Sequence, residues 1–174
     1  MRVDAVTGEA VPLYDSRNLT LELTRAGMRA DQAERLANSA GSIFNAAESA
    51  ILFYALNDVW YYDITGRKLR RLTNNPDEEK ELALSPDGKK ASFVRGNNIF
   101  VADVAKGGEK QLTRDGREGD KAIYNGYLDW VYEEELYGRG NKRGYWWSPD
   151  SSHIAFLQLN EERVPRFTIV DDMP

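Results

Sequence analysis

The stretch NDVWYYDITGRKLRRLT, residues 57–73, recurs as NNIFVADVAKGGEKQLT in residues 97–113, an offset of 40 residues (57 to 97). An asparagine opens both stretches, an aspartate falls near the middle of each, and a Leu-Thr pair closes both. Short apolar runs separated by turn residues predict β-strands. A period of about 40 residues built from such strands is typical of β-propeller blades. The repeat therefore predicts a mostly β protein of the propeller type.

One complete repeat unit runs from residue 81 to residue 113. ELALS at its start predicts an inner strand, and KASFV, NIFVADV and KQLT predict the next three strands. The turn SPDG, Ser85–Gly88, has the serine, proline and glycine that a type I β-turn favours at its first, second and fourth positions. We therefore expect four-stranded antiparallel blades over residues 41–80 and 81–116.

A third copy of the repeat begins at GYWWSPDSSHIAFLQL and predicts the start of another blade over residues 145–174. Its Ser-Pro-Asp turn lies 63 residues after the previous one (85 to 148), and the excess over one period falls on residues 117–144. This stretch holds three consecutive glutamates, residues 133–135, between aromatic side chains. Insertions into repeat proteins form loops on one face, often the binding face. The acidic insertion is therefore the candidate functional site.

The beginning of the chain departs from the repeat. Residues 1–14 resemble the last hairpin of a blade, and residues 15–40 predict a helical excursion. Two helices are expected there, at about 16–25 and 31–37. Asp31, followed three residues later by Glu34, predicts an N-terminal capping pair for the second helix. The side chains expected to be buried are Leu19, Leu23 and Leu36.

About three blades are visible in a chain of 174 residues, whereas a closed propeller needs about four to eight. We therefore expect a partial β-propeller with a short helical insertion near the N-terminus. Open sheet edges pair readily with other strands, so association of identical chains through these edges is expected.

The composition narrows the classes of function. The net charge of −5 disfavours nucleic acid as a partner, and the lack of cysteine excludes thiolate metal sites and cysteine nucleophiles. No apolar run approaches the roughly 18 residues of a membrane span, so no membrane segment is expected. The single histidine, His153, stands where Lys90 stands in the repeat and is expected to be exposed. Because the sequence also has no G-x-S-x-G motif, we expect no catalytic residue and no cofactor in this chain.

The three glutamates admit several chemistries. A metal site is not expected, because adjacent residues of a helix point about 100° apart and no histidine lies nearby. A carboxylate pair flanked by aromatic rings could act on a glycosidic bond. The pair could instead bind an ammonium group such as a peptide α-amine, whose three donors need acceptors. A solvated acidic helix without a ligand is the third alternative.

The segment DWVYEEE, residues 129–135, resembles the dipeptidyl peptidase IV family of serine exopeptidases. LALSPDGKKASFVRGNNIFVAD, YNGYLDWVYEEELYG and GYWWSPDSSHIAFLQLNEERVP follow in the family's order, so the resemblance covers residues from about 50 to 174. It implies an eight-bladed propeller joined to an α/β-hydrolase domain, in a peptidase that releases N-terminal dipeptides with proline or alanine second. It also suggests a periplasmic or extracellular location.

The resemblance assigns roles within the acidic insertion. Glu134 and Glu135 would bind the N-terminal amine of the peptide substrate, whereas Glu133 receives no substrate contact. The supporting residues that would hold the short helix in place are Asp129, Trp130 and Tyr132.

Two departures from the family pattern limit what can be transferred. Family members often carry an arginine on a propeller arm that holds a substrate carbonyl, but the corresponding hairpin, FYALNDVWYYD, is tight and has no arginine. The serine, aspartate and histidine of the hydrolase domain are also absent from these 174 residues. We therefore expect the propeller portion of such a peptidase, inactive by itself. The alternative is a stand-alone partial propeller that binds a cationic partner without catalysis.

Overall fold

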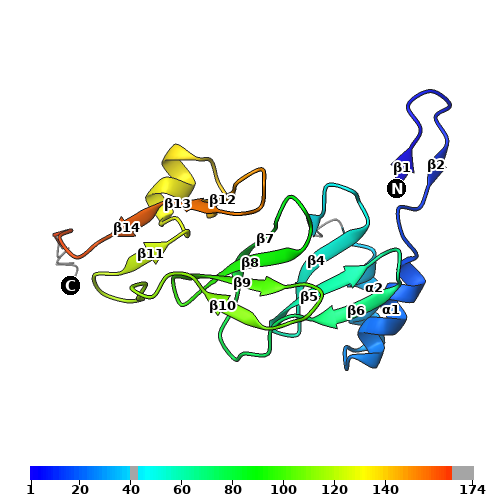
Figure 1. Ribbon diagram of the computed structural model, residues 1–174, viewed down its shortest axis with the longest axis horizontal. Coiled ribbons are helices and arrows are strands. Elements are labelled where there is room, and N and C mark those ends of the chain that lie inside the picture. Colours follow the sequence, from blue (N-terminus) through cyan, green and yellow to red (C-terminus); the bar gives the residue numbers. More distant parts are fainter. Residues whose placement is uncertain (40–42, 166–174) are drawn as a thin grey trace, which may run out of the picture.

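The computed structural model describes residues 1–39 and 43–165. Most of this part of the chain is antiparallel β-sheet, and none of its sheets closes on itself (Figure 1). Two four-stranded sheets dominate, with the orders β3-β4-β5-β6 and β10-β9-β8-β7. Strands that are consecutive in the sequence are neighbours in each sheet, as in propeller blades. The mostly β repeat architecture predicted from the sequence is confirmed.

The bounds of the strands are as follows. The first sheet contains β3 (Ile43–Phe44), β4 (Ala50–Ala55), β5 (Asp58–Asp63) and β6 (Lys68–Arg71). The second contains β7 (Lys80–Leu84), β8 (Lys90–Arg95), β9 (Asn98–Asp103) and β10 (Glu109–Gln111). Two short pairs follow, β11 (Ile123–Asn125) with β14 (Gln158–Asn160) and β12 (Tyr145–Trp147) with β13 (Ile154–Phe156). β1 (Arg2–Val3) and β2 (Ala10–Val11) form a hairpin that stands apart from the sheets at one end of the molecule (Figure 1).

The Ser-Pro-Asp turns connect the first two strands of successive repeats. Gly88 N–H donates to the Ser85 carbonyl (2.8 Å), and the Ser85 hydroxyl donates to the Asp87 carboxylate (2.6 Å). The copy at Ser148 repeats both contacts, with Ser151 in the place of Gly88. Asp87 N–H also donates to the Ser151 hydroxyl (3.0 Å). The repeated turn is therefore both a local signal in the sequence and a contact between two repeats.

The Leu-Thr pair that closes each repeated stretch fixes the end of the outer strand. The Thr73 hydroxyl donates to the Asp58 carboxylate (3.2 Å), and the Thr113 hydroxyl donates to the side-chain carbonyl of Asn98 (3.1 Å). Each threonine hydroxyl also accepts the N–H of the residue that follows Asp58 or Asn98. Asp58 and Asn98 are buried, so their polar groups need such partners. The same threonine contact therefore recurs in both blades.

The two helices precede the first sheet. α1 (Ser16–Arg25) occupies the predicted range, and its cap is Asp15, whose carboxylate accepts two N–H groups of the first turn. α2 spans Ala30–Ala37. The capping pair predicted for it was wrong, because Arg29 is the N-cap residue and Asp31 pairs instead with Arg35 one turn later (3.0 Å). Asp31 lies inside the first turn, so its carboxylate reaches along the helix face rather than back to the free N–H groups.

The helices cover one face of the first sheet. Leu19 and Leu23 are buried as predicted, whereas Leu36 is half-buried because Ala33 and Ala37 occupy the inner face of α2. The sheet side chains that pack against them include Ile51, Phe53, Trp60 and Tyr62. A second apolar cluster joins the two sheets and includes Leu52, Val59, Leu72, Phe93 and Val104. Each such buried side chain contributes about 1.5–3 kcal/mol, so these clusters hold the blades side by side.

The division of the chain into blade end (1–14), helical excursion (15–40), two blades (41–80 and 81–116), acidic insertion (117–144) and next blade (145–174) stays a prediction. Residues 40–42 and 166–174 lie outside the described residues, and the end of the last predicted segment, FTIVDDMP, falls there. Within the described part of the chain, no helix is long and apolar enough to cross a membrane.

Candidate functional site

A polar network around the buried Asn125 side chain anchors the acidic insertion to the blade before it. The Asn125 side chain is fully buried, donates to the Asp115 carboxylate (2.9 Å) and accepts from the Gln158 amide (2.8 Å). Gln158 also donates to Asp115 (2.8 Å), which closes the network across the β11–β14 pair. The hydrogen bond from Asn125 holds the pKa of Asp115 below its usual value. Asn125 N–H donates to the Asn97 carbonyl (3.1 Å), so the network continues to the β8–β9 turn.

A short ladder of backbone hydrogen bonds closes the loop that carries the glutamates. Leu128 N–H donates to the Lys142 carbonyl (2.8 Å), and Gly144 N–H donates to the Gly126 carbonyl (2.9 Å). Residues 129–141 therefore leave and re-enter the fold through one neck. The position of the loop is consequently set by the strands on either side of it.

The glutamates lie on one helical turn, η1 (Tyr132–Leu136), which has π-helical hydrogen bonding. The Asp129 carboxylate accepts Tyr132 N–H (2.9 Å) at the start of the turn, and Tyr137 N–H donates to the Tyr132 carbonyl (2.9 Å) at its end. The Tyr132 and Tyr137 rings stack with centroids 6.1 Å apart. Asp129 and Tyr132 thus make contacts within the turn, whereas Trp130 is 66% exposed.

The three glutamates differ in their surroundings. Glu133 is held internally, because its carboxylate accepts Gly140 N–H (3.1 Å) and pairs with the Lys142 ammonium (3.1 Å). The hydrogen bond that Lys142 donates to Glu133 raises the pKa of Lys142. Glu134 and Glu135 are exposed, and neither has a hydrogen bond or ion pair within residues 1–39 and 43–165. Two adjacent carboxylates are therefore open to a ligand.

Exposed apolar side chains lie on this turn and next to it in the chain. Trp130, Leu136 and Tyr137 are 66%, 62% and 47% exposed. Aromatic and aliphatic groups beside a charge lower the local dielectric constant and strengthen its attraction for an opposite charge. The turn therefore combines acceptors for a cation with apolar surface that can exclude water from it.

The internal partners of Glu133 were missed by the sequence reasoning. Gly140 and Lys142 belong to GRGNKRG, which reads as a flexible connection. The only local sign of this ion pair in the sequence was a lysine several residues after the glutamates. Its pairing depends on the neck of the loop, which brings Lys142 back beside the helical turn.

The other groups weighed as functional lie elsewhere. His153 is exposed, as predicted, and its Nδ1 lies 2.5 Å from the Ser152 hydroxyl in the third repeat turn. Ser152 also donates to Asp150 (2.7 Å), so the serine stands between the acid and the histidine, whereas in a catalytic triad the histidine stands between the acid and the serine. The hairpin that corresponds to the family's arginine-bearing arm is short. Its strands, β4 and β5, are connected by a two-residue turn, Leu56 and Asn57, with φ of 52° and 63°. In the described ranges, no group of three or more histidine or acidic side chains could hold a metal ion.

The comparisons with known proteins identify the family of the chain. The family model described as "Dipeptidyl peptidase IV (DPP IV) N-terminal region" matches residues 43–174. The probable dipeptidyl peptidase 4 of Aspergillus fumigatus is 39% identical over 115 residues, which cover 64% of this chain and 14% of that protein. The dipeptidyl peptidase 4 of Felis catus is 35% identical over 104 residues, which cover 60% of this chain and 13% of that protein.

A solved structure supports the fold. The crystal structure of Porphyromonas gingivalis dipeptidyl peptidase 4 superposes with a TM-score of 0.70 at 24% sequence identity, covering 98% of this chain and 24% of that one. The predicted partial β-propeller is thereby confirmed, and this chain spans only a small part of the length of its relatives. By the match of its residues 43–174, the chain belongs to the dipeptidyl peptidase IV family, as part of the N-terminal region of such a peptidase.

Proposed function

We propose that this chain supplies the amine-binding part of a peptidase that releases N-terminal dipeptides, with proline or alanine at the second position. Glu134 and Glu135 bind the N-terminal amine of the substrate. One observation carries the proposal: of three consecutive glutamates, Glu133 is paired internally, while Glu134 and Glu135 keep free carboxylates beside exposed aromatic rings.

The chemistry of an amine fits this pair. A protonated α-amine carries three donors and no acceptor, and two neighbouring carboxylates can accept from it with charge-assisted hydrogen bonds. Its free pKa is about 7.7–8.0, so nearby carboxylates favour its charged form at neutral pH. A substrate held by its amine presents its bonds at fixed distances from the glutamates. This explains a specificity for the bond after the second residue.

The reaction itself needs groups from outside these 174 residues. We propose that an α/β-hydrolase domain elsewhere in the whole protein supplies the serine, aspartate and histidine. The native gene product is then expected to have a mass several times 19.7 kDa when detected in its source cells with an antibody to this chain. A product near 19.7 kDa would instead support a stand-alone binding module.

We also propose that the isolated chain associates through its open sheet edges. Unpaired N–H and C=O groups at such edges favour pairing with another strand. Light scattering of the isolated chain is expected to give a defined oligomer, and a monomer at all concentrations would contradict this.

The amine-binding role is tested in the whole peptidase with Ala-Pro-p-nitroanilide. Glu134→Gln or Glu135→Gln should each lower kcat/KM roughly 10-fold to 100-fold, since each removes the negative charge from one acceptor of the amine. Glu118→Gln, an exposed glutamate outside the turn, is the matched control and should change nothing. Unchanged kinetics in both Glu134→Gln and Glu135→Gln would remove the proposal.

A further inference from the structure

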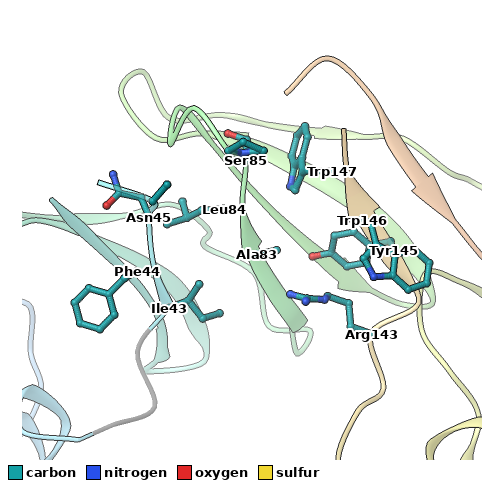
Figure 2. A pocket seen from close by; sticks show the side chains of 12 residues that line it. Ile43, Phe44, Asn45, Ala83, Leu84, Ser85, Arg143, Tyr145, Trp146 and Trp147 are labelled. Carbon is teal, nitrogen blue, oxygen red and sulfur yellow. The ribbon is translucent and has the colours of Figure 1, made fainter. Parts of the chain in front are cut away.

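A cavity lies beside the neck of the acidic loop. The first strands of three successive repeats, β3, β7 and β12, line it, and its volume is about 270 Å³. Figure 2 shows Arg143 and Tyr145 extending across it towards the strand that bears Ala83. Arg143 belongs to the neck of the loop that bears Glu134 and Glu135.

Arg143 is the charged group of this cavity. Its side chain is exposed, and its guanidinium makes no hydrogen bond or ion pair with any residue in the described ranges. Glu81 of β7 attracts it through space without an ion pair, and the Glu81 side chain is half-buried. Lys142, the neighbouring cation, is already paired with Glu133. Arg143 is therefore a cation near the loop that makes no ion pair within the part of the chain that the structure describes.

The walls of the cavity suit a bound carboxylate. Tyr145 is buried, and its hydroxyl is engaged with the Glu81 carbonyl and with Ser92, so the ring is fixed in place. Trp146 and Phe44, which also line the cavity, are 44% and 36% exposed and contribute aromatic surface to its walls. A guanidinium presents a planar fork of donors that matches the two oxygens of a carboxylate.

We infer that this cavity is a carboxylate subsite, in which Arg143 binds the carboxylate of a short peptide whose amine is held by Glu134 and Glu135. The inference rests on the proposed function. One ion pair links the turn to the neck: Glu134 follows Glu133, Arg143 follows Lys142, and the Glu133 and Lys142 charged groups are 3.1 Å apart. A short peptide with free ends carries both complementary charges. The subsite therefore favours peptides that are short enough to place a carboxylate near Arg143.

The test uses the whole peptidase and three peptides: Ala-Pro-Ala with a free C-terminal carboxylate, its C-terminal amide, and Ala-Pro-Asp amide. The unmodified protein should show a KM for the free acid about 10-fold or more below that for the Ala-Pro-Ala amide. Arg143→Gln should bring the acid-to-amide ratio of KM to about one. Arg139→Gln, which removes the same charge from an exposed position of the loop, should keep the ratio.

The outcomes separate the alternatives. A preference for Ala-Pro-Asp amide over Ala-Pro-Ala amide that depends on Arg143 would make an acidic side chain the source of the carboxylate and would also support the subsite. No preference in the unmodified protein, or a preference that survives Arg143→Gln, would overturn it. If Arg143→Gln does not fold, Arg143→Lys should still reduce the preference because it keeps the charge and loses the fork. If Glu134→Gln and Glu135→Gln leave kinetics unchanged while the acid preference still depends on Arg143, the amine-binding proposal fails and the subsite stands.

Discussion

The internal pairing of Glu133 should determine how firmly the acidic turn is held. In the variant Glu133→Ala, Gly140 N–H loses its acceptor and Lys142 loses its carboxylate partner. Glu134 and Glu135 stay in place in the sequence, but the turn that bears them loses both side-chain links to the returning strand. The expected result is a local loss of order around residues 133–141.

The size of the effect follows from the exposure of the pair. The side chains of Lys142 and Glu133 are 37% and 18% exposed. An exposed ion pair contributes about 0.2–1 kcal/mol, and a hydrogen bond to a charged group about 1.5–3 kcal/mol when it is well protected. For a partly exposed pair we expect about 1–2 kcal/mol in total. This corresponds to a change of roughly 5-fold to 30-fold in an opening equilibrium.

Amide hydrogen exchange measures this opening directly. Exchange of Gly140 N–H should accelerate roughly 5-fold to 30-fold in Glu133→Ala. Gly144 N–H, which donates to the backbone carbonyl of Gly126, should be unchanged and serves as an internal control. Glu118→Ala is the matched control variant. Exchange of Gly140 within a factor of about two of the unmodified protein would refute the assignment of Glu133 as the internal link.

Three further changes test the fold around the site. Arg71→Gln should lower the free energy of unfolding by about 1–3 kcal/mol, because it leaves the buried Asp58 carboxylate without its charged partner. Adding Asp58→Asn to Arg71→Gln should recover part of this loss, since an asparagine fills the equivalent place in the next blade. A double-mutant cycle measured by urea unfolding checks this, and additive effects of the two substitutions on the free energy of unfolding would contradict the pairing. Burial raises the pKa of Glu81 from its usual 4.5, so its ionised form is disfavoured in the folded state. Glu81→Gln should therefore raise the free energy of unfolding at pH 7, and the gain should disappear as the pH falls below about 4.5; a gain independent of pH would contradict this. Gly116→Ala should cost about 1–3 kcal/mol in thermal or urea unfolding, because the added Cβ would lie 2.1 Å from the Asn97 carbonyl oxygen, and an unchanged midpoint would contradict that contact.

Much of the fold could be predicted because the repeat is encoded in local hydrogen bonds. The Ser-Pro-Asp turn at Ser85 joins residues only a few positions apart, so the same residues recur wherever the turn recurs. The corresponding turn of the first blade, at Asn45, was not recognised. In this turn the side-chain carbonyl of Asn45 accepts Ala50 N–H (3.0 Å) and so closes the chain reversal. The turn lacks the serine and proline of the later copies. The capping error at Asp31 has a similar origin, because the sequence does not state at which residue a helix begins.

The candidate site, too, could be predicted only in part. The sequence by itself determined that an acidic insertion interrupts the repeat and that three glutamates stand within it. It could not separate Glu133 from its neighbours, because that distinction depends on Lys142 returning through the neck of the loop. The free guanidinium of Arg143 is likewise visible only when strands from three repeats meet around one cavity. Local patterns specify turns and strands, whereas contacts between residues far apart in the chain arise from packing, and these contacts decide which charges remain open to a ligand.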